Sequence, residues 1–259
     1  MTTAQGSAVR CELDESTGVA VVEFSHPPFN YFDAQLIRAI GDTYADLDAN
    51  HRCRAIVLAS SGKHFCAGAD FSKGRLSDEA TGDLYAQAAR LFSFSIPVVA
   101  AVQGRAIGGG LGVAMSADFR VAAPATRFVC NFSRLGTHHG FGLSVTLPAA
   151  LGQQRALELL YTGADIAGER ALEIGLCDRL ATTRDVRTEA VAFAETIAEA
   201  APLAVRAIRR TMWAERYPDQ IRVATEVERR EQSVLFDTED FREGVRAVAE
   251  RRAPRFGGQ

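Results

Sequence analysis

Three consecutive glycines, Gly108 to Gly110, interrupt the stretch AVQGRAIGGGLGVAMSADFRVAA at residues 101–123. Glycine has no side chain, so main-chain N–H groups at such a place can approach an oxyanion closely. A phosphate-binding loop is the first interpretation, but no Gly-Lys-Ser/Thr follows, and the G-x-G-x-x-G spacing of dinucleotide sites is not cleanly met. The glycines therefore need a different role, and tight packing of a helix on a sheet is the alternative to chemistry.

A second glycine turn follows the same local pattern. The segment GKHFCAGADF at residues 62–71 comes after the apolar run 54–60, and PVVAAVQGRAIGGGLG at residues 97–112 repeats the order of strand, glycine turn and helix. Two such turns can each aim a backbone N–H at the same point, where developing negative charge would be stabilised. The pattern predicts a site built from two main-chain donors.

Two adjacent histidines, His138 and His139, lie in the glycine-rich segment RLGTHHGFG. Histidine titrates near neutral pH and is a common general base, so either side chain could move a proton. A loop histidine that caps a turn or faces solvent is the alternative interpretation. No metal site is expected, because His26, His51 and His64 are isolated and no H-E-x-x-H motif or carboxylate cluster occurs.

Composition narrows the class of protein. The chain has 259 residues, 47% of them hydrophobic, and a net charge of −3, which disfavours a general role in binding nucleic acid or a membrane surface. Its five cysteines are scattered and have no C-x-x-C spacing, so neither a disulfide framework nor a zinc site is predicted. The N-terminus MTTAQGSAVRCELDE has no apolar signal core. We expect a cytoplasmic protein that binds a small molecule.

The glycine turns are positioned by short apolar runs that alternate with helical patterns. Residues 19–24, 54–60, 97–102 and 119–123 read as strands buried on both faces. A helical apolar stripe follows a predicted N-cap at Asp33: Leu36, Ile37, Ile40, Tyr44 and Leu47. From about residue 185 helix follows helix with no strand candidate. Such alternation predicts an α/β core over residues 1–200 and a helical region over residues 201–259.

Five segments together resemble the enoyl-CoA hydratase/isomerase, or crotonase, family over nearly the whole chain. They follow one another in family order: GKHFCAGADF, PVVAAVQGRAIGGGLG, SADFRVAAPATRF, YTGADIAGERALEIGLCDRL and FREGVRAVAERRAPRF. The resemblance implies a crotonase-like spiral of β-β-α units with a helical C-terminal region. It also implies a homotrimer or a dimer of trimers in which that region packs between subunits. The substrate would be an acyl-CoA, with no cofactor besides the coenzyme A of the substrate itself.

The resemblance assigns the two main-chain donors. Members of the family polarise a thioester carbonyl between two N–H groups, which here would be those of Ala69 and Gly109. An enolate oxygen carries developing negative charge, and each preorganised donor is worth roughly 3–4 kcal/mol to the barrier. The bare backbone would then let the thioester carbonyl lie against these amides.

The acid and base groups depart from the family pattern. Hydratases carry a glutamate shortly after the glycines and a second one later, and these positions read Gly112 and Phe132 here. Each missing group removes a contribution of roughly 10²–10⁴-fold, so ordinary hydration of an enoyl thioester is expected to be severely impaired. The 4-chlorobenzoyl-CoA dehalogenase branch is also similar, but its aspartate nucleophile is replaced by Gly140.

The resemblance places further residues around the acyl-CoA. Tyr85 falls near a position where some relatives have a catalytic histidine or tyrosine, which makes it a catalytic candidate beside His138 and His139, although core packing is the alternative. The predicted substrate-binding residues are Pro28, Asn30, Ala67, Asp70, Phe71, Lys73, Gly112, Phe132, Leu135, Gly136 and Arg251. Two classes of function stay open: an enzyme that acts through an enolate with a non-standard acid/base set, and a non-catalytic acyl-CoA-binding protein.

Overall fold

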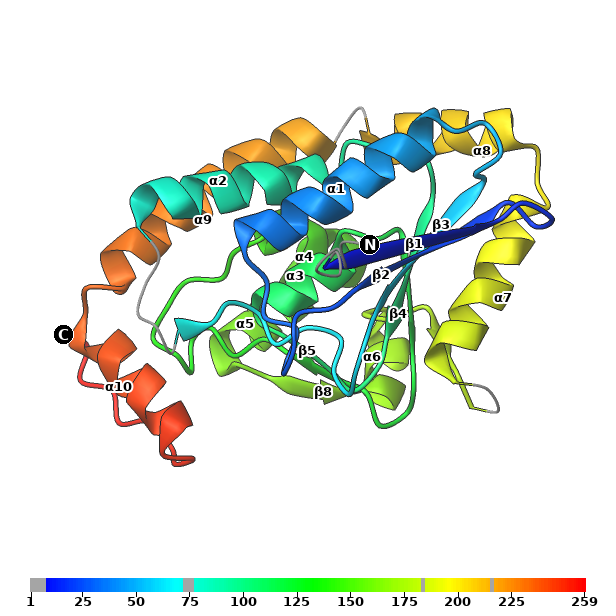
Figure 1. Cartoon of the computed structure of the whole chain (residues 1–259). Coiled ribbons are helices and arrows are strands. Elements are labelled where there is room, and N and C mark those ends of the chain that lie inside the picture. The colour runs from blue at the N-terminus through cyan, green and yellow to red at the C-terminus, as the bar shows by residue number, and fades with distance from the viewer. Residues whose placement is uncertain (1–7, 72–76, 183–184, 215–216) are drawn as a thin grey trace, which may run out of the picture.

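A six-stranded sheet runs through the molecule, and two of its strands lead into the glycine turns (Figure 1). The computed structural model describes residues 8–71, 77–182, 185–214 and 217–259. In spatial order the strands are β1 (Val9–Asp14), β2 (Val19–Phe24), β3 (Ala55–Ser60), β4 (Val98–Val102), β6 (Phe119–Ala122) and β9 (Arg179–Leu180). Strand β1 is antiparallel to β2, and the other neighbours are parallel. The four predicted strands are confirmed as β2, β3, β4 and β6.

A second sheet of three short strands lies beside the first. It contains β5 (Arg105–Ile107), β7 (Arg127–Val129) and β8 (Asp165–Ala167), in that order. Along the chain a strand of the large sheet is followed by a strand of the small sheet and then by a helix, as in β4, β5 and α3 (Gly109–Met115). This repetition is the predicted spiral of β-β-α units.

Helices cover both faces of the large sheet. The first, α1 (Ala34–Ala49), begins at the predicted cap, because the Asp33 carboxylate accepts a hydrogen bond of 2.7 Å from Leu36 N, and its predicted apolar stripe is buried. On the opposite face the alanines of α7 (Val186–Ala198) pack against valines of β3, β4 and β6. The remaining helices of the core are α2 (Asp78–Arg90), α4 (Leu143–Leu151), α5 (Gln153–Thr162) and α6 (Gly168–Ile174).

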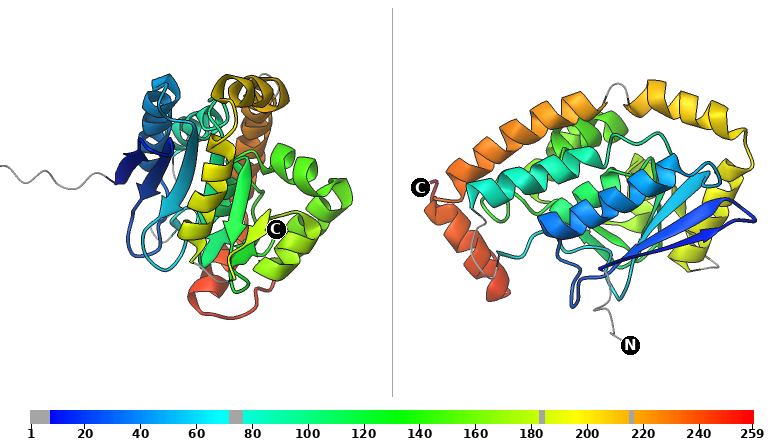
Figure 2. Two further views of the ribbon diagram at one scale, coloured as in Figure 1. Left: turned by 90° about the vertical axis from the view of Figure 1, so that its right-hand side faces the viewer. Right: turned by 45° about the horizontal axis from the view of Figure 1, so that its top comes forward.

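The region after residue 200 is helical, as predicted, and packs on the core of its own chain. It comprises α8 (Pro202–Arg209), a π-helical turn (Arg210–Ala214), α9 (Tyr217–Leu235) and α10 (Glu239–Ala249). Helices α1, α2 and α9 lie side by side (Figure 1; Figure 2, right). A buried ion pair of 2.7 Å between Arg209 and Asp118 holds α8 to the core. Within the described ranges no helix is both long and apolar enough to cross a membrane.

Candidate active site

The two glycine turns meet beside the start of α3. Gly68 has φ +85°, and a Cβ atom built on it would lie 3.5 Å from the amide nitrogen of Gly109. Hydrogen bonds from Ile107 N to Cys66 O (2.9 Å) and from Cys66 N to Arg105 O (3.1 Å) hold the two segments together. The structure therefore brings the predicted donor segments of Ala69 and Gly109 into contact.

The amides of Ala69 and Gly109 are free to bind an acceptor. Neither has a hydrogen-bond partner in the part of the chain that the structure describes, whereas the amide of Gly108 donates to Val129 O at 2.8 Å. Ala69 and Gly109 are also partly accessible, while Gly68, Gly108 and Gly110 are buried. Among these residues the accessible, unbonded amides are those that the sequence predicts as the donor pair.

Aromatic rings lie over the glycine helix. A Cβ atom on Gly109 would lie 2.5 Å from Cζ of Phe32, so this ring covers the glycine. Phe32 in turn contacts Phe141, with ring centroids 5.4 Å apart. A Cβ atom on Gly112 would overlap that of Phe141. The space that a side chain at position 112 would need is therefore filled by Phe141.

Phe132, at the second position predicted for a family glutamate, is an apolar wall of the site. It is buried, and its Cε1 would lie 3.7 Å from a Cβ atom on Gly108. Its ring meets that of His139 edge to face, with centroids 6.2 Å apart. Phe132 therefore lies close to both the His139 ring and the start of the glycine helix, and its ring can donate or accept no proton.

The two histidines stack on each other but have different partners. Their ring centroids are 4.0 Å apart, and His138 Nδ1–H donates to the carbonyl of His139 at 2.8 Å. His139 Nε2 lies 2.8 Å from Ser144 Oγ. Burial, together with the nearby charge of His138, lowers the pKa of His139 to about 3. The His139 ring is therefore neutral at neutral pH.

A carboxylate from α9 reaches the same loop. Glu228 is fully buried and accepts hydrogen bonds from Gly142 N (2.9 Å), Ser144 N (2.9 Å) and Ser144 Oγ (2.6 Å). Burial raises the pKa of this carboxyl group, and the three donors oppose that shift. Neither Glu228 nor Ser144 was predicted from the sequence. The available signal was the helical spacing of Ile221, Thr225, Glu228 and Gln232, and the structure buries these four residues on α9.

Tyr85 joins α2 to α9 and to the histidine loop. Its hydroxyl donates to Gln232 Oε1 at 2.8 Å, and Gln232 Nε2 donates to His138 O at 2.8 Å. Burial and the charge of Glu228 raise the pKa of Tyr85, so the phenol stays protonated. A Cβ atom on Gly140 would overlap the Tyr85 hydroxyl, which explains the glycine at that position. A catalytic role for Tyr85 stays a prediction.

The predicted substrate-binding turn borders the first donor loop. Ala67 N donates to Phe29 O at 3.1 Å, which places Pro28 and its neighbours beside this loop, and Pro28 is exposed. The buried amide of Asn30 is occupied, since its nitrogen donates to Ser61 O (2.7 Å) and His64 O (2.9 Å). Its side-chain oxygen accepts from His26 N at 2.9 Å and its backbone N–H donates to His26 O at 2.8 Å, so these groups of Asn30 are engaged within the turn.

The remaining predicted residues lie where the core meets the C-terminal helices. Phe71 packs against Phe236 and Phe241, with ring centroids 5.8 and 5.5 Å away, and follows Asp70 in the donor loop. The turn formed by Leu135 and Gly136 lies against α10, where Leu135 O would overlap a Cβ atom on Gly244. Arg251 is exposed just beyond α10, and Lys73 lies outside the described residues. The role of these residues in substrate binding remains a prediction.

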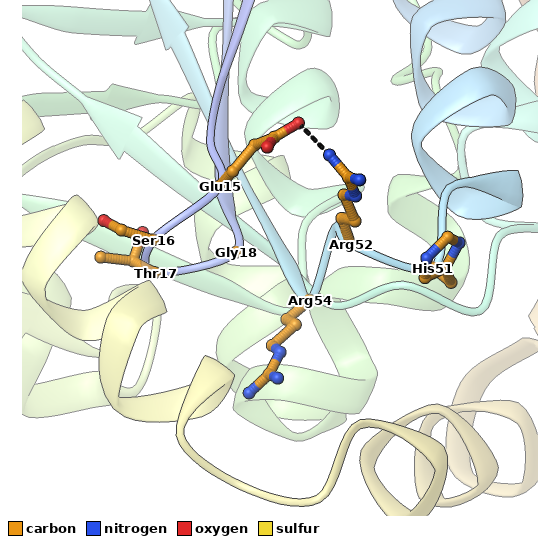
Figure 3. Close-up of a pocket in the computed structure, with 7 residues that line it drawn as sticks. All are labelled: Glu15, Ser16, Thr17, Gly18, His51, Arg52 and Arg54. Atoms are coloured by element: carbon orange, nitrogen blue, oxygen red, sulfur yellow. Dashed lines mark hydrogen bonds and ion pairs between the residues drawn. The ribbon is translucent and has the colours of Figure 1, made fainter.

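A polar pocket lies at the opposite ends of the strands, away from the glycine turns. It is lined by Glu15, Ser16, Thr17, Gly18, His51, Arg52 and Arg54 (Figure 3). Its residues precede β2 and β3, whereas the donor turns follow β3 and β4. Two of its cations are already bound, since Arg52 pairs with Glu15 at 2.7 Å and Arg54 donates to Ala198 O at 3.1 Å. Over the described ranges, no three His, Cys, Asp or Glu side chains gather as metal ligands.

Comparison with known proteins gives one consistent relationship. A probable enoyl-CoA hydratase (echA8) of Mycobacterium tuberculosis is 32% identical over 252 residues, which cover 94% of this chain and 96% of that protein. The (E)-benzylidenesuccinyl-CoA hydratase of Thauera aromatica is 31% identical over 261 residues, covering 95% and 98%. The crystal structure of an enoyl-CoA hydratase/isomerase from Pseudoalteromonas atlantica matches with a TM-score of 0.84 at 25% identity, over 97% of this chain and 100% of that one. The family model for enoyl-CoA hydratase/isomerase matches residues 14–259, and the chain therefore belongs to the enoyl-CoA hydratase/isomerase family.

Proposed function

We propose that this protein is an enzyme that converts a coenzyme A thioester by way of an enolate. The thioester carbonyl would accept hydrogen bonds from the amides of Ala69 and Gly109, and removal of an α-proton would leave negative charge on that oxygen. The family relationship supports a CoA thioester as substrate, since the similar proteins carry names of enzymes that act on enoyl-CoA or benzylidenesuccinyl-CoA. Coenzyme A is part of the substrate, and we expect no further cofactor and a cytoplasmic location.

The observation that carries this proposal is the meeting of the two donor turns. Gly68 lies against the amide nitrogen of Gly109, and the amides of Ala69 and Gly109 are partly accessible and lack acceptors among the described residues. Partly accessible amides of this kind can bind water in the free protein, and a ligand oxygen can take the place of that water. The arrangement suits an anionic oxygen.

The proton-transfer groups differ from the glutamate pair expected in a hydratase. Gly112 and Phe132 cannot transfer protons, and the nearest described candidate is His139, whose neutral ring meets Phe132 edge to face. We therefore propose that His139, with His138 stacked on it, replaces the glutamates, and that ordinary enoyl hydration is slow.

Exchange of α-protons tests the proposal without knowledge of the natural reaction. The protein is incubated in D₂O with butyryl-CoA, and the thioester is followed by mass spectrometry. Enolate formation predicts deuterium at the α-carbon, and a parallel panel of enoyl-, β-ketoacyl- and aryl-CoA esters would identify the reaction. Binding of these thioesters with neither exchange nor any change of mass would instead favour the alternative, a non-catalytic acyl-CoA-binding protein.

A further inference from the structure

The buried carboxylate of Glu228 lies on α9, a helix that supplies no group to the reaction proposed above. Glu228 lies 86 positions from Gly142 in the sequence, yet its two oxygens accept the backbone N–H groups of Gly142 and Ser144, where the loop that carries His138 and His139 enters α4. A buried charge is costly unless it is hydrogen-bonded, and the donors of this loop supply the hydrogen bonds that the Glu228 carboxylate needs. Helix α9 thus fixes the conformation of the loop that carries His139.

Ser144 connects Glu228 to His139. Its Oγ lies 2.6 Å from Glu228 Oε1 and 2.8 Å from His139 Nε2, and the hydroxyl has only one proton to donate. The carboxylate is an acceptor only, so the Ser144 hydroxyl donates its hydrogen bond to Glu228, and Ser144 Oγ is left to accept from His139 Nε2–H. This order of donors leaves Nδ1 of His139 with a free lone pair.

The His139 ring is placed beside the proposed reaction centre. It meets the ring of Phe132, which itself lies against Gly108 at the start of the glycine helix. The His139 side chain keeps 17% of its exposure, whereas that of Glu228 has none. No partner is found for His139 Nδ1 over the described ranges. The His139 side chain is therefore partly accessible, whereas the carboxylate can act only through another residue.

We propose that Glu228, acting through Ser144, is a positioning residue that holds His139 in its Nε2–H tautomer so that Nδ1 accepts the substrate proton. In this step the α-carbon–hydrogen bond breaks, its electron pair moves into the enolate, and the proton forms a bond to Nδ1. The resulting imidazolium has a carboxylate oxygen 4.0 Å from Nε2. A carboxylate from α9 thereby assists the proton transfer for which Gly112 and Phe132 supply no base. The proposal rests on the proposed enolate chemistry.

The tautomer of His139 can be measured in the free protein. Long-range ¹H–¹⁵N correlation spectra of histidine-labelled protein distinguish a protonated Nε2 from a protonated Nδ1, and the signals of His139 are assigned from the variant His139→Gln. Wild type is expected to show Nε2–H alone. Ser144→Ala, which keeps both backbone donors to Glu228, should give a mixture of tautomers, whereas Ser144→Thr should restore the single form. Glu226→Gln, an exposed carboxylate on the same helix, is the matched control and should change nothing.

The same variants are then compared in the exchange reaction. Ser144→Ala should lose up to about 100-fold in the exchange rate through misplacement of the base, with unchanged affinity for butyryl-CoA, and Ser144→Thr should recover most of the rate. A wild-type tautomer that persists in Ser144→Ala, or an unchanged exchange rate, would overturn the positioning role. A serine-dependent tautomer in a protein that exchanges no α-proton would leave the contact intact and would instead refute the enolate chemistry, and with it the catalytic part of this proposal.

Discussion

Gly68 lies so close to Gly109 that a Cβ atom on the first would be 3.5 Å from the amide nitrogen of the second. The contact joins the segment after β3 to the segment that leaves β4 through β5, where β3 and β4 are neighbouring parallel strands and Cys66 pairs with Ala106. Because parallel strands end at the same edge of a sheet, two loops that follow such strands can share one ligand. This topology brings together the amides of Ala69 and Gly109, which we propose as the donor pair.

Substitution of Gly109 by valine should damage the site more than the fold. A Cβ atom there meets the tip of the Phe32 ring, which can move, and a branched side chain would occupy the path of the thioester. We expect the α-proton exchange rate to fall roughly 10²–10³-fold, as for loss of an oxyanion donor. Gly82→Val is the control, because a Cβ atom on Gly82 meets nothing within 4 Å. Equal rates and equal thioester affinity in the two variants would refute the assignment of Gly109.

Restoring the two acids requires space as well as charge. Wild type should hydrate crotonyl-CoA orders of magnitude more slowly than a family hydratase, because it lacks the carboxylate pair. The variant Gly112→Glu with Phe132→Glu should gain little, since Phe141 fills the space beside position 112. Adding Phe141→Ala should allow hydration to rise, and spectrophotometric assay of crotonyl-CoA compares the three proteins. Brisk hydration by wild type would show that the catalytic positions are misassigned.

The buried His139 should make stability depend on pH. Burial lowers its pKa in the folded chain to about 3 from an ordinary value of 6.5, so between pH 6.5 and pH 3 the unfolded chain binds a proton that the folded chain does not. Stability from this group is therefore present above pH 6.5 and is lost as pH falls. Between pH 7 and pH 5 wild type should lose up to about 2 kcal/mol more than His139→Gln. Urea unfolding at both values, with reversible transitions and unchanged m, measures this difference, and parallel losses in the two proteins would contradict it.

Parts of this architecture could be predicted because their signals are local. Strand β4 is apolar at every position and β3 is apolar up to Ser60, and Asp33 precedes a helical stripe, so composition and spacing are sufficient. Strands β5, β7 and β8 have only three residues each, which is too short for a periodic signal. Their existence depends on pairing between distant segments.

The site divides in the same way. The two glycine turns could be predicted, because a positive φ at Gly68 and the close approach of Cys66 O to Gly110 both favour glycine. The contact of Glu228 with Gly142 and Ser144 could not, since it depends on how α9 packs on the core. The sequence shows only a charged residue that shares one face of a helix with Ile221, Thr225 and Gln232. Phe141 is similar: its aromatic character was visible, but not that it fills the space beside Gly112.

The C-terminal region should also mediate assembly. Large apolar side chains are exposed on α8 and the turn after it, with Leu203 at 81%, Ile208 at 62% and Met212 at 70%. Such a stripe favours a partner surface, and family resemblance predicts a trimer or a dimer of trimers. Light scattering at micromolar concentration should give that mass, and Leu203→Glu with Met212→Glu should reduce it. Tyr161→Glu, at an exposed aromatic on α5, is the control, and a monomeric wild type would contradict the prediction.

A crystal structure with a bound, non-reactive acyl-CoA thioester tests the central claim most directly. The proposed chemistry predicts the thioester carbonyl oxygen about 2.7–3.1 Å from the amide nitrogens of both Ala69 and Gly109, with Phe32 displaced from its place over the glycine. His139 should then face the α-carbon across the edge of Phe132. A thioester that binds with its carbonyl oxygen outside hydrogen-bond distance of both amides would contradict the account.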